Sequence, residues 1–346
     1  MTKQLNPLEL AARVLRPQVF VRLIAPFILA LAMHNNLRAP GPGVIGALLA
    51  LSLMWIAATS WNDLSDTGAD VVNVRDDPGR PLARGETTRG ALRALAIVAA
   101  VASLVIACID GVAVAAVMAG VLVVAAAYSL RPMRLGARPY LPYPALGVAY
   151  GAAPYLLALA AMHIDIGARD AAVAGILSAM FAGRMLLKDF RDVRGDELIG
   201  KPTFLLRHGA FATTTLAGLL IAAATGALVV CMGLPTWATA ATIAYVGATG
   251  GYLWRVGHAP SWTDQAVAII LIVRSSAAFF MVLALAAMQN QSQIDASMAA
   301  LLGALLGTTV VVTHITNIPI SAGARRGLRA PLRELVPGIA LFPLPL

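Results

Sequence analysis

The chain has 346 residues, of which 59% are hydrophobic and only 12% are charged, and its mean hydropathy is +0.78. These values lie far from those of a soluble globular domain and indicate an integral, multi-pass membrane protein. The net charge of +9 fits basic loops that set the membrane orientation and meet anionic lipid. The expected partner is therefore the lipid bilayer, and no nucleic acid is expected.

An amphipathic segment, residues 1–17, comes before the first long apolar stretch and is predicted to be a cytoplasmic N-terminal segment. Each apolar stretch that follows approaches or exceeds the roughly 20 residues that a spanning helix needs. These stretches are 18–34, 43–61, 90–109, 111–128, 141–162, 168–188, 210–232, 235–256, 265–288 and 297–317. The sequence therefore predicts an all-α fold, a polytopic membrane helical bundle of nine or ten transmembrane helices. Residues 18–290 form the bundle, and 291–346 add an extra transmembrane helix and a basic cytoplasmic tail.

The stretch 43–61 runs into an acidic segment, "WNDLSDTGAD", residues 61–70. It contains Asn62, Asp63, Asp66 and Asp70, and aspartates spaced i, i+3 and i+7 lie on one face of a helix. Alone, such a segment fits solvated charges at a helix end equally well. The basic segment "GRPLARGETT", residues 79–88, follows.

Basic residues gather in the loops after alternate apolar stretches, and the opposite loops are nearly bare. The loops after 43–61, 111–128 and 168–188 are the rich ones, whereas "GLPT", residues 233–236, has none. Because lysine and arginine favour the cytoplasmic side, the chain after 43–61, with its acidic segment, and the chain after 168–188 are predicted to face the cytoplasm. The expected location is a bacterial cell membrane.

A second acidic segment, "KDFRDVRGDELIGKPT", residues 188–203, repeats the aspartate spacing of the first. Its members are Asp189, Asp192 and Asp196. Six carboxylates in one cleft repel each other unless cations are present, and hard divalent cations prefer oxygen ligands. Mg²⁺ is the expected occupant, and because it binds through a few carboxylates plus substrate phosphates, a diphosphate is the expected third party.

With both motifs in place, the sequence resembles the UbiA superfamily of intramembrane prenyltransferases, whose marks are NDxxDxxxD after the second helix and DxxDxxxD after the sixth. "GRPLARGETT" resembles the basic segment of that family, and "YSLRPMRL", residues 128–135, resembles its Tyr-Ser segment. The resemblance covers about residues 10 to 290. It departs at Gly136, where family members often have lysine, and Arg131 or Arg134 is the expected substitute.

The resemblance implies a bundle around a central cavity that binds a prenyl diphosphate through Mg²⁺ and transfers the prenyl group to a small aromatic or lipidic acceptor of unknown identity. The implied catalytic residues are Asp63, Asp66, Asp189 and Asp192. The implied metal ligands are Asn62, Asp63, Asp66, Asp70, Asp189, Asp192 and Asp196. The implied substrate-binding residues are Asn62, Arg80, Tyr128, Arg134, Lys188, Arg191 and Lys201. Two roles are open for the tyrosines, which either line the cavity or serve as interfacial or packing residues: Tyr128, Tyr143, Tyr150 and Tyr155.

Two alternatives remain open from the sequence. A terpene cyclase on the same scaffold ionises the same prenyl diphosphate and lets the chain close on itself. A transporter also carries charged motifs between helices, but its coupling charges are expected near the bilayer midplane, whereas these aspartates gather at one face.

Overall fold

The computed structural model describes residues 4–73, 77–258, 262–299 and 301–303, and in these ranges the chain is helical with no strand. The first part contains α1 (Pro7–Leu15), α2 (Pro17–Met33), α3 (Pro42–Asn73), α4 (Arg89–Asp110) and α5 (Val112–Ser129). The middle contains a 3-10 helix, η1 (Leu135–Ala137), followed by α6 (Pro142–Gly147), a π-helix, η2 (Val148–Ala152), and α7 (Ala153–Ala161). The last part contains α8 (Ala168–Leu186), α9 (Lys188–Leu198), α10 (Phe204–Met232), α11 (Thr236–His258) and α12 (Trp262–Asn290).

Within the described ranges, six helical units are long and apolar enough to cross a membrane: α3, α4, α5, the continuous unit α6–η2–α7, α10 and α12. The bent pairs α1–α2 and α8–α9 raise the number to eight if each pair is one span. The predicted count of nine or ten is not confirmed. The helix α11 has 23 residues but is rich in threonine and glycine and is not among the six, and most of 297–317 lies outside the described residues.

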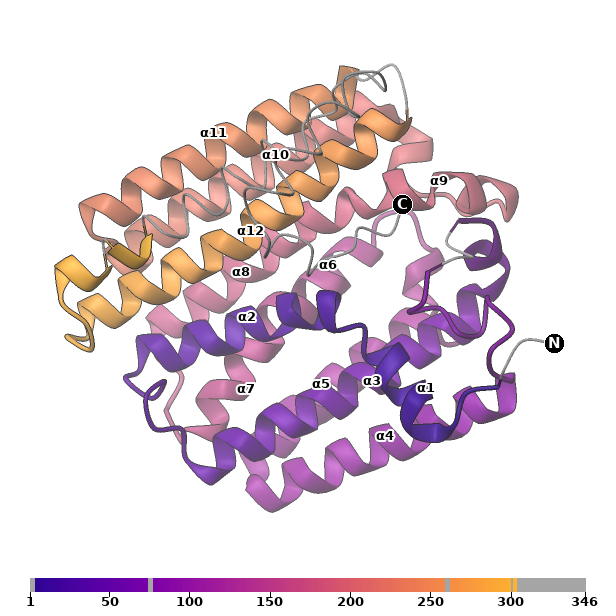
Figure 1. Ribbon diagram of the computed structural model, residues 1–346, viewed down its shortest axis with the longest axis horizontal. Coiled ribbons are helices and arrows are strands. Elements are labelled where there is room, and N and C mark those ends of the chain that lie inside the picture. Colours follow the sequence, from indigo (N-terminus) through magenta and orange to yellow (C-terminus); the bar gives the residue numbers. More distant parts are fainter. Residues whose placement is uncertain (1–3, 74–76, 259–261, 300, 304–346) are drawn as a thin grey trace, which may run out of the picture.

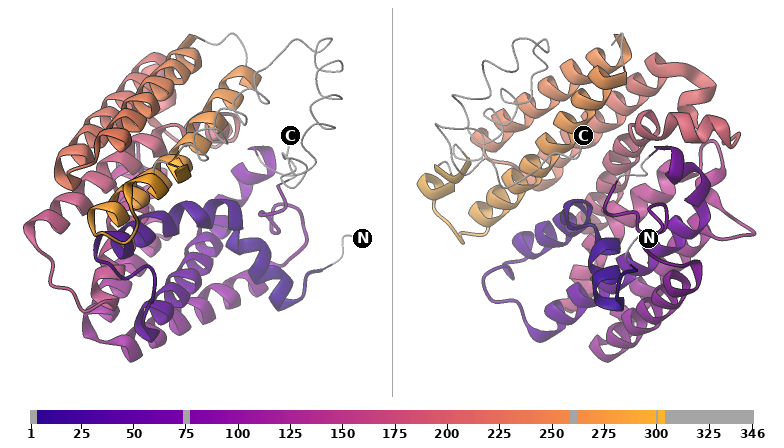
Figure 2. Two further views of the ribbon diagram at one scale, coloured as in Figure 1. Left: turned by 60° about the vertical axis from the view of Figure 1, so that its left-hand side comes forward. Right: turned by 45° about the vertical axis from the view of Figure 1, so that its right-hand side comes forward.

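The helices form two groups joined by a central layer (Figure 1). The helices α10, α11 and α12 lie side by side in one group, and α3, α4 and α5 lie in the other, with α2, α7 and α8 between them. The two turned views keep this division (Figure 2). The end of the bundle that carries α9, the last turns of α3 and α1 is called the motif end below, because both aspartate motifs lie there.

Local sequence explains where several helices begin and end. Asn6 and Glu9 form a capping box at the start of α1, and Thr88 and Thr203 cap α4 and α10 through their side chains. The predicted break between two adjacent spans is confirmed at Gly111, whose φ of 133° separates α4 from α5. Few residues other than glycine tolerate this conformation, so the chain reverses there.

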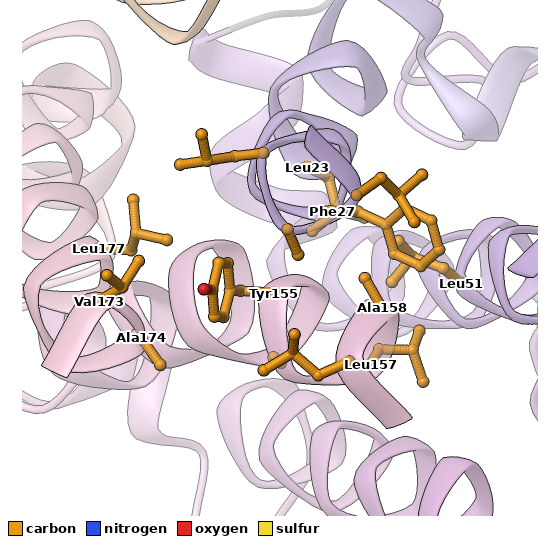
Figure 3. Packing of buried hydrophobic residues seen from close by; sticks show 14 of the residues in the cluster. Leu23, Phe27, Leu51, Tyr155, Leu157, Ala158, Val173, Ala174 and Leu177 are labelled. Atoms are coloured by element: carbon orange, nitrogen blue, oxygen red, sulfur yellow. The ribbon is translucent and has the colours of Figure 1, made fainter. Parts of the chain in front are cut away.

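The hydrophobic core occupies the central layer, where α2, α3, α7 and α8 meet. Tyr155 of α7 lies between Leu177 of α8 and Phe27 of α2, and all three side chains are fully buried (Figure 3). The Tyr155 hydroxyl donates a hydrogen bond of 2.7 Å to Asp170, whose carboxylate also lies 3.0 Å from His34 Nε2. Tyr155 is therefore a packing residue with a satisfied hydroxyl, which is one of the two roles that the sequence leaves open for it.

Candidate active site

The first motif lies in the last three turns of α3, and two guanidinium groups meet its aspartates. Asp63 is 1% exposed and is contacted by Arg16, from the α1–α2 junction, and by Arg80, from the loop after α3, each at 2.5 Å. Arg80 also bonds to Asp70 at 2.6 Å. Arg16 Nε donates to the carbonyl of Gly79 at 2.8 Å. The N-terminal segment and the loop are thus joined to the motif through one carboxylate.

The remaining members of this motif face the chain after α5. Asn62 Nδ2 donates to Asp66 Oδ2 at 2.7 Å, which orients that carboxylate. Arg134 donates to the carbonyl of Ser65 at 2.9 Å and lies 3.5 Å from Asp66 Oδ1. Of the two arginines expected to take the place of a lysine at Gly136, Arg134 reaches the site.

The second motif lies on α9, which bends by 51° from α8. Tyr143 donates its hydroxyl hydrogen to Asp189 and accepts from the backbone N–H of Phe204 at 2.9 Å. Asp192 bonds to Lys188 at 3.0 Å and to Arg191 at 2.8 Å. Lys201 lies 3.3 Å from Asp196 Oδ1.

A single asparagine fastens the two motifs together. Asn73, the last residue of α3, donates through Nδ2 to the carbonyl of Asp192 at 2.8 Å and accepts through Oδ1 from the N–H of Gly195 at 2.7 Å. The helices also approach closely, because a Cβ atom at Gly195 would lie 2.8 Å from the carbonyl oxygen of Ala69. A glycine is required at this contact, and it holds the second motif against the first.

The electrostatics of this end depend on paired charges. Burial alone lowers the pKa of the Arg80 guanidinium, but the neighbouring carboxylates of Asp63 and Asp70 outweigh burial and raise that pKa above its ordinary value. Arg80 is therefore a permanent cation, 6% exposed, between two aspartates. It contributes positive charge at the place where the sequence predicts an anionic substrate group.

The carboxylate oxygens of the two motifs suit a Mg²⁺ ion that also binds the phosphate oxygens of a substrate. Among the described residues, no three histidine, cysteine or acidic side chains form a cluster that would hold an ion by themselves, so the six carboxylates do not converge on one point. Asp196 is 2% exposed, and its Oδ2 atom is buried with no hydrogen-bond partner. A buried carboxylate oxygen without a partner is costly unless a cation completes it. Because Mg²⁺ binds through one or two carboxylates plus phosphate oxygens and water, this arrangement suits it.

A small cavity adjoins the second motif, and the Tyr128 ring in its wall explains why residue 136 is glycine. Tyr128, Arg138, Lys188 and Lys201 are among its lining residues. A Cβ atom at Gly136 would lie 3.0 Å from the Tyr128 ring, so this ring occupies the space that a longer side chain at 136 would need. Arg138 brings a cation to the same cavity from two residues further along the chain.

Sequence reasoning did not assign a site role to several residues that the structure places here. Asn73 and Arg138 were missed, and Arg16 was left between two interpretations, a cation for the carboxylate of an acidic acceptor and a membrane anchor. No local pattern distinguishes Arg16 from an ordinary membrane anchor, because its contact with Asp63 joins segments 47 residues apart. Asn73 follows the first motif by one turn, and that position is the only signal that could have indicated it.

The chain matches the family model of the UbiA prenyltransferase family over residues 23–268. No curated protein matches it significantly. It is similar to the structure of digeranylgeranylglyceryl phosphate synthase in membranes, with a TM-score of 0.62 and 12% identity over 82% of this chain and 100% of that chain. A UbiA homolog from Archaeoglobus fulgidus bound to DMAPP and Mg²⁺ gives a TM-score of 0.58 and 15% identity over 79% and 99%. The same homolog bound to GPP and Mg²⁺ gives 0.56 and 15% over 90% and 100%. At these identities the likeness shows the fold alone.

Proposed function

The chain belongs to the UbiA prenyltransferase family, and on that premise we propose that it moves a prenyl group from an allylic prenyl diphosphate to a small aromatic or lipidic acceptor and releases diphosphate. The observation that carries the proposal is the pair of aspartate motifs, held together by Asn73 and surrounded by cations. The archaeal homolog that shares the fold was obtained with DMAPP or GPP and Mg²⁺, which supports the same donor class here.

Metal binding is assigned to Asn62 and the six aspartates of the two motifs. Bound Mg²⁺ supplies positive charge that stabilises the diphosphate leaving group. Asp196 offers its unpartnered oxygen, and Asn62 holds Asp66 in one orientation. Asp63 and Asp70 also have Arg80 between them, so these two carboxylates hold a guanidinium beside the proposed metal site.

The basic residues are assigned to the diphosphate. Departure of the diphosphate breaks the allylic C–O bond, and its electron pair leaves with the oxygen, so donors and cations aimed at that oxygen lower the barrier. Lys188, Arg191 and Lys201 approach from the second motif, and Arg80 and Arg134 approach from the side of the first. Guanidinium and ammonium groups are well suited to phosphate oxygens.

The remaining steps need an enclosed, weakly nucleophilic environment. The acceptor bonds to the allylic carbon that loses diphosphate, and the proton that the acceptor loses passes to the released diphosphate. Tyr128 lines the cavity beside the second motif, and we assign it to the wall of the space where the reacting groups would meet. The lipid-facing helices around it keep bulk water from the cation.

The test is mass spectrometry of products after the purified protein is incubated with prenyl diphosphates of several lengths, with and without candidate acceptors. The proposal expects a coupled product and free diphosphate when Mg²⁺ is present, and neither in chelator. A cyclic hydrocarbon or alcohol formed from the donor alone, with no coupled product, would replace this proposal with terpene cyclisation. Uptake of unchanged donor into vesicles would replace it with transport.

A further inference from the structure

The C-terminal end of α1 is docked on one face of α3. The Val14 carbonyl accepts a hydrogen bond from Thr59 Oγ1 at 3.2 Å. The Leu15 carbonyl accepts one from Trp55 Nε1 at 2.8 Å. The last carbonyl groups of a helix have no partner within that helix, and α3 supplies the partners here. Residues 55, 59 and 63 are spaced by four and share one face of α3, so the next position on this face is Asp63 of the first motif.

Arg16, the residue after this docked end, contacts Asp63. Its Nη2 atom donates to both carboxylate oxygens, and its Nε atom donates to the carbonyl of Gly79 at 2.8 Å. Arg80 shares only the Oδ1 atom of Asp63. Within the described chain, the Oδ2 atom of Asp63 is therefore bonded by Arg16 alone. The Arg16 side chain is 12% exposed, so this pairing is largely shielded from water.

A metal ion at Asp63 competes with Arg16 for this oxygen. Both cations bind the same lone pairs, and their positive charges repel each other at short range. A metal ion alone would also leave the Arg16 guanidinium largely buried without its anion, which is strongly unfavourable. A metal–diphosphate complex differs, because its diphosphate brings negative charge and its phosphate oxygens suit a guanidinium. The charges therefore favour an exchange of partners when metal and diphosphate arrive together.

Movement of Arg16 acts on α1, because Arg16 directly follows the docked carbonyl groups. The helix α1 has nine residues, too few to be stable without packing. Its two buried side chains, Leu10 and Val14, belong to a cluster with side chains of α3 and α4 (Figure 1). The chain before α1 is held separately, because the N–H of Leu5 donates to the carbonyl of Glu86 at 3.0 Å. The N-terminal side of α1 thus stays attached if its other end is released.

We propose that Arg16 is an internal counter-ion of Asp63, that a complex of Mg²⁺ with a prenyl diphosphate displaces it, and that this exchange releases the end of α1 from α3. The Arg16 guanidinium then binds the diphosphate, and Asp63 binds the metal. The inference rests on the proposed function, because that function assigns Asp63 to the metal. The exchange makes metal binding and donor binding depend on each other, and such a coupling is reciprocal.

Binding of Mn²⁺ as a probe tests the exchange. Free Mn²⁺ is measured by electron paramagnetic resonance, with and without an unreactive thio analogue of geranyl diphosphate. Arg16→Gln removes the competing cation, so it should bind Mn²⁺ alone about 10-fold more tightly than the wild type, the value of a hydrogen bond to a charged group. The same variant should bind the analogue with Mg²⁺ about 10-fold more weakly, because it lacks the guanidinium that moves to the diphosphate. An arginine that only positions Asp63 would not change the two affinities in opposite directions.

Arg13→Gln is the matched control. Arg13 lies on α1 about one turn before Arg16, and its side chain is exposed. This variant should leave both affinities unchanged. Arg16→Lys keeps the competing charge, so it should bind Mn²⁺ alone as weakly as the wild type does.

Thiol labelling follows the release of α1 and leaves Arg16 intact. In a background in which Cys108 and Cys231 are replaced by serine, Val14→Cys places a thiol at a fully buried position of α1. Mg²⁺ and the analogue together should speed its labelling about 10-fold, because loss of a charged hydrogen bond makes local opening easier. Mg²⁺ alone should not speed it. Ser103→Cys, at a fully buried position of α4, should react slowly under both conditions.

Two results overturn the exchange: Arg16→Gln binds Mn²⁺ alone no more tightly than the wild type, or Val14→Cys reacts no faster with Mg²⁺ and the analogue than without them. If Arg16→Gln does not purify as a single species, the labelling of Val14→Cys decides. Both results leave the proposed function standing. A wild type that binds neither Mn²⁺ nor the analogue, even when both are present, overturns the proposed function and the exchange together.

Discussion

Replacement of Gly195 by alanine should inactivate the protein although it adds one methyl group on a helix. The new Cβ would lie 2.5 Å from Nδ2 of Asn73 and 2.8 Å from the carbonyl oxygen of Ala69, and both distances are well inside van der Waals contact. Ala69 O belongs to the backbone of α3 and cannot rotate away. Relief of the overlap therefore requires α9 to move away from α3.

The cost follows from the two parts of this contact. Overpacking of one methyl group costs about 1–3 kcal/mol. The two hydrogen bonds of Asn73, at 2.7 and 2.8 Å, contribute about 1 kcal/mol each and weaken as the helices separate. A shift of about 1 Å between reacting groups lowers turnover roughly 100-fold, which is a loss of about 2.7 kcal/mol in transition-state stabilisation in addition to the loss of stability.

The assay compares Mg²⁺-dependent diphosphate release and thermal unfolding for Gly195→Ala and Gly68→Ala. Gly68 also lies within an aspartate motif, but a Cβ there would meet nothing within 4 Å, so Gly68→Ala should keep its activity and gain slight helix stability. Gly195→Ala should release diphosphate about 100-fold more slowly while it remains folded. Wild-type release by Gly195→Ala would show that the contact of α9 with α3 does not position the site.

Three further predictions concern two contacts of the site and the membrane orientation. Asp63→Asn leaves two largely buried guanidinium groups with less compensation, so it should lower the stability by about 3–5 kcal/mol as well as the activity; an unchanged melting temperature would contradict the pairing. Tyr143→Phe removes the donor to Asp189 and the acceptor of a backbone N–H. The unsatisfied groups should lower the free energy of unfolding by about 1–3 kcal/mol, and a melting temperature equal to that of the wild type would contradict these two hydrogen bonds. In a background without native cysteines, Glu197→Cys should react with an impermeant thiol reagent only from the cytoplasmic side and Pro40→Cys only from outside; the opposite pattern would reverse the orientation.

Part of the fold could be predicted because it depends on local chemistry. The break at Gly111 follows from "CIDG", and the helical face of Asp63, Asp66 and Asp70 follows from their spacing. The span count depends on more than length. The bends at Arg16 and Leu187 place α1 and α9 at an angle to their neighbours. Pro17 marks a break after Arg16 but does not give the angle, and neither glycine nor proline marks the bend at Leu187.

The sequence predicted which residues form the candidate site better than it predicted which basic residue pairs with which carboxylate. The aspartates were expected to face one another around metal ions, yet Asp63 faces Arg16 and Arg80. Which basic residue reaches which carboxylate depends on tertiary packing, because Arg16 comes from a junction far away in sequence. The role of Tyr155 depends on packing in the same way: its helical register, set by the packing of α7 on α8, turns its hydroxyl toward Asp170.

The central claim is that both aspartate motifs bind one diphosphate together with Mg²⁺. Its most direct test is calorimetric titration of the purified protein with an unreactive thio analogue of geranyl diphosphate, with Mg²⁺ or chelator, in the wild type and in Asp66→Asn and Asp192→Asn. The account predicts binding that requires Mg²⁺ and weakens at least about 10-fold in each variant, since each removes a charge from a different helix. Equal affinity in chelator, or a loss confined to one motif, would contradict it.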